Sequence, residues 1–260
     1  MKQKIIASLT SYPARISTIR KVIESIANQT VRADKIILYL AQEQFLKEEL
    51  PEILTDLLRK HPEFEIRRWN QDIRSFKKLV PALTEFPDDI IITFDDDIIY
   101  SKNVIKKLMK SYKKYPNAIS GCRVKLIKIK DGNIEKYKKW SRYRTLRLLI
   151  SGSGPKFTNI ATTGGGALFP PHSLHPDVIR DDVFMNLCPT TDDLWFWAMA
   201  VLNGTKTVPA GKYISIQVIE ESQTEALSHD NLWGKNLNDK NMKKILEIYP
   251  EIKNRIFKHI

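Results

Sequence analysis

Cysteine is scarce in this sequence, and long hydrophobic runs are absent from it. Cys122 and Cys188 are the only cysteines, and their spacing fits no metal-binding or redox motif. We therefore expect free thiols in a reducing compartment such as the cytoplasm. No apolar segment approaches the roughly 20 residues that a membrane-spanning helix needs. The charged start of the chain leads only into the short apolar run 5–9, so we expect no signal peptide.

Internal repeats and low-complexity linkers are also missing. The chain has 260 residues, of which 42% are hydrophobic and 28% are charged, an ordinary globular mixture. This length and composition allow one sizeable core, and we predict a single domain over residues 1–260. The regular alternation of apolar segments ends near residue 125. We therefore expect function to divide into the halves 1–125 and 126–260.

Positive charge is in excess, with 42 Lys and Arg against 30 Asp and Glu and a formal net charge of +12. Such a balance indicates an anionic partner, namely nucleotide phosphates, a membrane surface or a nucleic acid. A nucleic-acid-binding protein is one alternative, but the charge is spread along the chain and no known binding motif is present.

Basic residues are most concentrated in segment 136–147, where they alternate with aromatic residues, and at the C-terminus. The C-terminal members are Lys243, Lys244, Lys253, Arg255 and Lys258. We interpret both groups as a surface for an anionic membrane or a lipid-diphosphate acceptor, which predicts peripheral association with the inner face of the cell membrane. An ordinary solvated basic surface is an equally good interpretation.

Apolar, β-branched segments alternate with helical patterns from the first residues onward. This alternation predicts an α/β fold with a doubly wound, mostly parallel sheet. Ligands of such sheets bind beyond the carboxyl ends of the strands. Residues 131–133 predict a hairpin turn. The predicted strands are residues 5–9, 35–40, 65–69, 90–94, 118–126 and 213–219.

Three consecutive carboxylates, Asp95, Asp96 and Asp97, follow the apolar run 90–94. Adjacent acids repel one another, and hard carboxylate oxygens suit Mg²⁺ or Mn²⁺ held together with substrate phosphates. Because side chains alternate along an extended chain, we expect Asp95 and Asp97 to face the same way and Asp96 to point elsewhere. The alternative is a solvated acidic turn before a helix. The polar turn 10–15 also follows a strand and should lie at the same sheet edge.

A second acidic pair, Asp192 and Asp193, opens an apolar helix that contains Trp195. Acids at this position can simply favour the helix dipole. They can also form part of a site, because a helix with so apolar a sequence must bury its start. The glycine run at 164–166 marks a tight turn, which is either a site element or only a bulge.

In their order along the chain, these motifs resemble GT-A fold glycosyltransferases. The similar features are the first strand with its polar turn, the acidic triplet, the glycine-rich turn and the later acidic pair. The closest group is the inverting family 2 enzymes of bacterial surface polysaccharide assembly. The resemblance extends from residue 5 to about residue 233. It implies a nucleotide-sugar-binding half, residues 1–125, and an acceptor-binding and catalytic half, residues 126–260.

Carried over by position, the resemblance implies the following site residues. Nucleotide and diphosphate contacts would come from Thr10, Ser11, Pro13, Arg15, Asp72, Lys78, Asp95 and Asp96. Asp95 and Asp97 would form the DxD motif and bind the metal, with His229 as a later metal or phosphate ligand. Gly165, Gly166 and Trp195 would contact the acceptor. Asp193 would be the general base, with Asp192 as the other candidate.

The resemblance predicts a hexosyltransferase with Mn²⁺ or Mg²⁺ as cofactor. Its donor would be a nucleotide sugar, with UDP as the expected nucleotide, and its acceptor a saccharide or lipid-linked saccharide. No specific nucleic acid partner is expected. A sugar-phosphate nucleotidyltransferase is a weaker alternative, because the N-terminal region has no glycine-rich phosphate loop that carries Lys and Arg.

Overall fold

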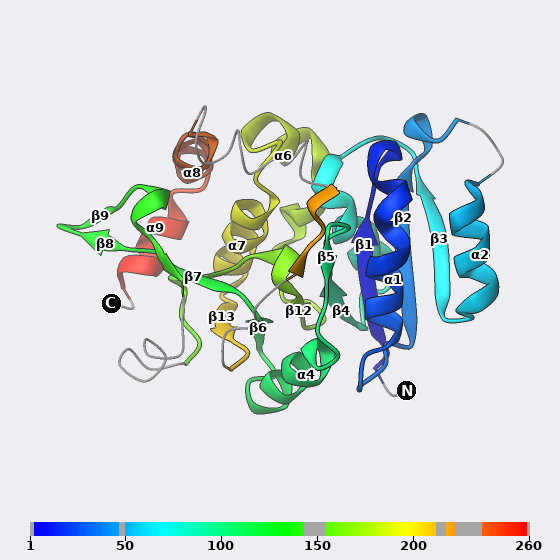
Figure 1. Ribbon diagram of the computed structural model, residues 1–260. Helices are drawn as coiled ribbons and strands as arrows, with labels where there is room; N and C mark the ends of the chain where they lie inside the picture. Colours follow the sequence, from blue (N-terminus) through cyan, green and yellow to red (C-terminus); the bar gives the residue numbers. More distant parts are fainter. Residues whose placement is uncertain (1–2, 47–49, 143–153, 212–216, 222–235, 259–260) are drawn as a thin grey trace.

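The computed structural model describes residues 3–46, 50–142, 154–211, 217–221 and 236–258 of the chain. One central sheet runs across the middle of the molecule, and helices pack against both of its faces (Figure 1). The architecture is therefore α/β, as the alternation in the sequence predicts.

Seven strands form the central sheet in the order β13-β6-β12-β4-β1-β2-β3. Their bounds are Ile5–Thr10 for β1, Lys35–Ala41 for β2, Phe64–Trp69 for β3, Ile90–Thr93 for β4, Ala118–Gly121 for β6, Ala167–Phe169 for β12 and Lys206–Pro209 for β13. Neighbouring strands are parallel except at β12, which is antiparallel to both β4 and β6. The first four predicted strands are confirmed as β1 to β4.

The predicted strand 118–126 is divided between two sheets. β6 ends at Gly121, and β7, Val124–Leu126, pairs instead with β10 and β11, which span Ser141–Arg142 and Asn159–Ala161. A Cβ atom at Gly121 would lie 2.9 Å from the Cβ of Ala161, so the close approach of the end of β6 to β11 requires a glycine. The apolar pattern runs through this bend unchanged, and for that reason a single strand was the wrong prediction.

Two further predictions concern short strands. The hairpin is confirmed, because β8, Ile129–Lys130, pairs antiparallel with β9, Asn133–Ile134, across Asp131 and Gly132, which have positive φ. Of the predicted strand 213–219, residues 213–216 lie outside the described residues. Its end forms β14, Gln217–Val218, which pairs with β5, Ile98–Ile99.

The two faces of the sheet bury separate apolar clusters, because successive residues of a strand point to opposite sides. Ile6 and Ile37 belong to one cluster, and their neighbours Ala7 and Ile36 to the other. The second cluster lies under α1, Ile19–Ala27, α2, Glu52–Lys60, and α4, Val104–Lys114. The first lies under α3, Val80–Glu85, α6, Asp181–Leu187, α7, Asp192–Asn203, α8, Leu237–Ile248, and α9, Glu251–Phe257. No helix in the described segments is long and apolar enough to cross a membrane.

Four segments converge at the carboxyl edge of the sheet. β1 and β4 both end there, and β12 begins there because it runs in the opposite direction, with Ala167 beside Thr93. The 3-10 turn Thr163–Gly165 that leads into β12 lies at the same edge, where the Thr93 hydroxyl donates to the Thr163 carbonyl at 3.3 Å. The start of α7 adjoins this turn, so the glycine run and both acidic motifs meet.

Candidate active site

The acidic triplet lies in a turn between β4 and β5, beyond the end of the strand. β4 ends at Thr93, before the triplet begins. The backbone N–H of Asp95 donates to the Tyr100 hydroxyl at 2.7 Å, and that hydroxyl donates to the Gly164 carbonyl at 2.6 Å. The alternation of side chains that holds in a strand does not apply here. The orientation of each acid is therefore set by its own partners.

Asp96 and Asp97 share the guanidinium group of Arg15. One Arg15 nitrogen lies 2.7 Å from Asp96 Oδ1 and 3.2 Å from Asp97 Oδ2. Ser11 Oγ donates to Asp96 Oδ2 at 2.6 Å. Burial would lower the pKa of Arg15, but Asp96 and Asp97 raise it above its usual value, so the guanidinium stays charged. The predicted meeting of the polar turn 10–15 with the triplet is confirmed.

Lys78 lies at the centre of the site, between acids from two distant parts of the chain. Its ammonium pairs with Asp95 Oδ1 and lies 3.1 Å from Asp192 Oδ2. Burial opposes the charge, yet Asp192, Asp95 and Asp193 raise the pKa of Lys78 above its usual value. This ammonium therefore joins the acidic triplet to the acidic pair.

The expected alternation, with Asp95 and Asp97 on one side and Asp96 on the other, does not describe how the three acids pair within the protein. Asp95 pairs with Lys78, whereas Asp97 contacts Arg15 together with Asp96. The physical reason is the turn, which separates the first acid from the other two.

Asp193 is held at the start of α7 by Thr163. The backbone N–H and the hydroxyl of Thr163 donate to Asp193 Oδ1 at 2.8 and 2.7 Å. Burial and the adjacent Asp192 raise the pKa of Asp193 to about 6, against the opposing effect of Lys78. A helix N-terminus would by itself lower a carboxyl pKa, so burial outweighs the dipole here. A carboxylate with this pKa can accept and release a proton near neutral pH.

The glycine run packs against protein side chains. An added Cβ at Gly164 would overlap the Asp95 carboxylate, and one at Gly165 would lie 2.6 Å from the Cγ and Cδ of Arg123. Gly166 adopts φ +89°, which favours glycine. Gly165 and Gly166 are buried against these side chains, and their contact with an acceptor stays a prediction. Their role is to let the turn fit between Asp95 and Arg123.

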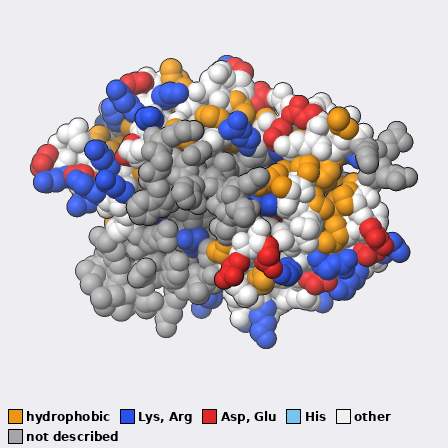
Figure 2. Space-filling view, turned by 45° about the horizontal axis from the view of Figure 1, so that its top comes forward, with side chains coloured by type: hydrophobic (Ala, Val, Ile, Leu, Met, Phe, Trp, Pro, Cys, Tyr) orange, Lys and Arg blue, Asp and Glu red, His pale blue; other side chains and the backbone are white. Residues whose placement is uncertain are grey.

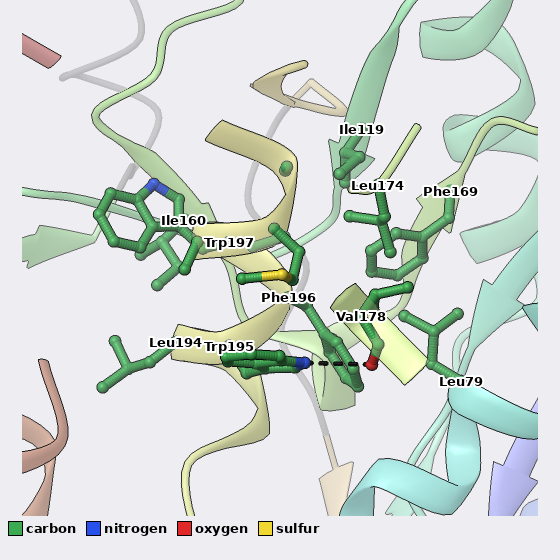
Figure 3. Close-up of a cluster of buried hydrophobic side chains, with 14 of the residues drawn as sticks. Leu79, Ile119, Ile160, Phe169, Leu174, Val178, Leu194, Trp195, Phe196 and Trp197 are labelled. Carbon is green, nitrogen blue, oxygen red and sulfur yellow. Dashed lines mark hydrogen bonds between the residues drawn. The ribbon is translucent and has the colours of Figure 1, made fainter. Parts of the chain in front are cut away.

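Trp195 belongs to the apolar core. Its ring is fully buried, and its Nε1–H donates to the Val178 carbonyl at 3.1 Å (Figure 3). The side chain has no exposed surface, so the structure gives no support to a contact between Trp195 and an acceptor, which stays a prediction. α7 is apolar on almost every side and buries nearly all of its residues, so its sequence does not reveal which side chains face the site.

Asp72 and Lys78 belong to different groups of side chains. Asp72 Oδ2 accepts from Gln44 at 2.7 Å, and Oδ1 pairs with the buried ammonium of Lys77. Burial lowers the pKa of Lys77, against the opposing effect of Asp72. The consecutive lysines thus point to different acids, since Lys78 points to Asp95.

Two other predicted residues also lie at the carboxyl edge. Thr10 ends β1, and its hydroxyl donates to the Tyr39 carbonyl at 2.8 Å. Pro13 begins the 3-10 turn Pro13–Thr18, which carries Arg15. Both residues therefore support the segment that brings Ser11 and Arg15 to the triplet.

Two acids of the triplet reach solvent. The side chains of Asp95 and Asp97 are 31% and 18% exposed, against 8% for Asp96. Two accessible carboxylates fit Mg²⁺ or Mn²⁺ when a bound diphosphate supplies further ligands. No three His, Cys, Asp or Glu side chains gather as a metal site in the chain segments that the structure describes. His229 lies outside the described residues.

Sequence reasoning missed four residues that shape this site: Lys77, Tyr100, Arg123 and Thr163. Thr163 directly precedes the glycine run, and this position is the one signal that draws attention to it. The other three have no distinguishing pattern, because each acts through contacts between segments far apart in the sequence.

The sequence comparison identifies the family. The family model described as Glycosyl transferase family 2 matches residues 10–168, more than half of the chain, and this span contains Arg15, Lys78 and the acidic triplet. The chain belongs to glycosyltransferase family 2. It is therefore a glycosyltransferase, and this assignment replaces both the polyanion-binding and the nucleotidyltransferase alternatives.

Two solved structures share the fold of this family 2 glycosyltransferase. The mannosyltransferase PcManGT from Pyrobaculum calidifontis, in complex with GDP-Man and Mn²⁺, has a TM-score of 0.58 and 12% identity over 98% of this chain and 69% of its own. S. aureus TarS 1-349 has a TM-score of 0.54 and 12% identity over 98% of this chain and 71% of its own. At such identities the likeness concerns the fold, which is the predicted α/β fold of GT-A type. A comparison with curated proteins found no match.

Proposed function

We propose that this glycosyltransferase moves a sugar, with inversion and with a divalent cation, from a UDP-sugar to a saccharide or lipid-linked saccharide acceptor. The observation that carries the proposal is the position of Lys78 between Asp95 and Asp192. The acidic triplet, as the proposed cation site, and the acidic pair, which contains the proposed base, thus adjoin one ammonium group, where a leaving diphosphate and an attacking hydroxyl can meet. The GDP-Man and Mn²⁺ bound to PcManGT support a nucleotide sugar and a metal.

On the donor side, Asp95 and Asp97 would hold Mn²⁺ or Mg²⁺, which when bound neutralises charge that develops on the leaving diphosphate. Arg15 remains charged beside Asp97 and would contact the phosphates. Lys78 supplies a second positive charge next to Asp95. The remaining donor contacts in this proposal come from Thr10, Ser11, Pro13 and Asp72, while Asp96 keeps Arg15 in place.

On the acceptor side, the base of this proposal is Asp193. Thr163 donates two hydrogen bonds to Asp193 Oδ1, which orients the carboxylate, and a pKa of about 6 leaves it ionised at neutral pH. Asp193 would accept the proton of the acceptor hydroxyl as the oxygen attacks the anomeric carbon. Asp192 is the weaker candidate, because its carboxylate pairs with Lys78.

The chain would then divide by role into a donor half, residues 1–125, and an acceptor half, residues 126–260. Arg15, Lys78 and the triplet belong to the first half, and the acidic pair to the second. A role in bacterial surface polysaccharide assembly, in the cytoplasm, is part of this proposal and rests on the family resemblance.

Calorimetric titration with UDP, GDP and CMP, each with and without Mn²⁺, tests the donor side. We expect UDP to bind in the presence of Mn²⁺ and the Asp97→Asn variant to lose this binding while it keeps the wild-type melting temperature. Asp182→Asn is the matched control, because Asp182 is an exposed acid paired with Arg180. If the wild-type protein binds no nucleotide under any of these conditions, the proposed function fails.

Peripheral membrane association also belongs to the proposal. Lys and Arg side chains gather at the end of the molecule that carries β8, β9, α8 and α9 (Figure 2). Arg255 does not belong to this surface, since it donates to the Val201 carbonyl and is partly buried. Arg144 and Arg147 lie outside the described residues. The exposed members are Lys136, Lys138, Lys139, Lys243, Lys244, Lys253 and Lys258.

Several lysines on one surface can together dock reversibly on anionic lipid, since each contributes about 1 kcal/mol. Co-sedimentation with phosphatidylserine vesicles at low salt should therefore retain the protein, and high salt should release it. An absence of sedimentation at low salt would contradict membrane association and leave the transfer reaction unaffected.

A further inference from the structure

We propose that Arg123 binds the acceptor, by pairing its guanidinium with a phosphate or carboxylate group on the acceptor saccharide. This inference rests on the proposed function and names the acceptor class, a negatively charged sugar.

Arg123 follows β6 at the edge where the site lies. Its carbonyl accepts the backbone N–H of Thr162 at 2.9 Å, and its side-chain stem crosses Gly165. Between these two contacts lies Thr163, which orients Asp193. Arg123 is thus fixed to both sides of the turn that holds the proposed base. A ligand whose hydroxyl reaches Asp193 would lie next to this turn.

The charge of Arg123 distinguishes it from the other cations of the site. Arg15 pairs with Asp96 and Asp97, Lys77 with Asp72, and Lys78 with Asp95 and Asp192.

Arg123, in contrast, forms no ion pair with any carboxylate among the residues that the structure describes. Its Nε, like that of Arg15, is buried without a hydrogen-bond partner there. A buried donor that lacks a partner is unfavourable, so an anionic ligand at this position would stabilise the site.

The position of Arg123 favours the acceptor over the donor. Arg15 and Lys78 pair with acids of the triplet, which lies beyond the ends of β1 and β4. β12 separates β4 from β6, so Arg123 lies on the far side of the glycine turn from Asp95. The planar fork of a guanidinium group matches two oxygens of a carboxylate or a phosphate. A charged acceptor could therefore be oriented with its hydroxyl toward Asp193.

Ligand-observed NMR titration tests this inference with three sugars: methyl glucoside, methyl glucuronide and glucose 6-phosphate. Saturating UDP and Mn²⁺ are present throughout, so that the donor phosphate positions are filled. We expect the wild-type protein to bind at least one of the charged sugars about tenfold more tightly than methyl glucoside. Comparison of the two charged sugars then tells a carboxylate site from a phosphate site.

Arg123→Gln should abolish the preference for charged sugars, and Arg123→Lys should retain part of it. Arg32→Gln is the matched control, because Arg32 is exposed in the loop between α1 and β2, and it should behave as wild type. Equal binding of all three sugars by the wild-type protein, or an unchanged preference in Arg123→Gln, would overturn the inference.

Titration of each variant with UDP and Mn²⁺ separates the inference from the proposed function. Arg123→Gln should bind UDP as the wild-type protein does. Weaker UDP binding in this variant would assign Arg123 to the donor and overturn its role toward the acceptor. Failure of the wild-type protein to bind UDP, or any other nucleotide, would count against the proposed function itself.

Discussion

Two cations organise this site in different ways. Arg15 pairs with Asp96 and Asp97, which are neighbours in one turn, and Ser11 adds a hydrogen bond to the same group. Lys78 pairs with Asp95 and Asp192, which come from opposite halves of the chain. The Arg15 group therefore fixes the shape of one turn, whereas the Lys78 group joins the donor side to the side of the proposed base.

The largest expected effect is that of Lys78→Met. This change leaves Asp192 buried without a counterion, and breaking a buried ion pair in this way costs about 3 kcal/mol. The free energy of unfolding, measured by urea denaturation, should fall by that amount, and sugar transfer should be lost. Lys102→Met, at an exposed position, is the control.

A double variant makes this test more specific. Lys78→Met combined with Asp192→Asn should recover part of the lost stability, because the unpaired charge is then gone. If Lys78→Met is as stable as the wild-type protein and as the control Lys102→Met, the two sides of the site are not joined through Lys78.

Asp193→Asn should lower the transfer rate about 10²- to 10⁴-fold, because an amide cannot accept the hydroxyl proton. UDP binding with Mn²⁺ should remain, since the hydrogen bonds of Asp193 go to Thr163 and not to the triplet. The free energy of unfolding should not fall in this variant, because burial makes the ionised form of Asp193 unfavourable and the neutral amide avoids this cost. Near-normal turnover in Asp193→Asn would move the role of base to Asp192.

The pH dependence of the rate should follow the ionisation of Asp193. Its pKa is raised to about 6, and the active form is the deprotonated one. At saturating donor, the rate should therefore fall about tenfold for each pH unit below 6 and level off above it. The residual rate of Asp193→Asn should lack this transition. A wild-type rate that is flat between pH 5 and 7 would contradict the assignment.

The contrast between the two groups also explains which parts of the site the sequence could predict. The strand pattern at β1 and β4 correctly brought the polar turn and the triplet to one edge, because the carboxyl ends of parallel strands share that edge. The proximity of Arg15 to the triplet follows from this placement, whereas its pairing with both Asp96 and Asp97 does not. Local patterns suffice where both partners lie directly after adjacent strands.

Side-chain directions beyond the strands were not predictable in this way. Asp95 and Asp97 pair with different cations because the triplet lies in a turn, and Trp195 points into the core because α7 is buried on almost all sides. Lys77 and Lys78 are neighbours of the same residue type, yet they pair with Asp72 and Asp95. Only the packing of distant segments decides which of the two faces the site.

The smallest expected effect lies in the Arg15 group. Ser11→Ala removes one hydrogen bond to a buried carboxylate, and Asp96 keeps its pair with Arg15, so we expect a loss of about 1.5 kcal/mol in unfolding free energy. Ser8→Ala is the matched control, since this buried hydroxyl of β1 has no hydrogen-bond partner and its removal should be neutral. The coupling between Ser11→Ala and Lys78→Met should be close to zero, because the two groups share no residue. A clear coupling energy would mean that the triplet acts as one unit, with Asp95 tied to Asp96 through the turn, and that the Arg15 and Lys78 groups are not independent.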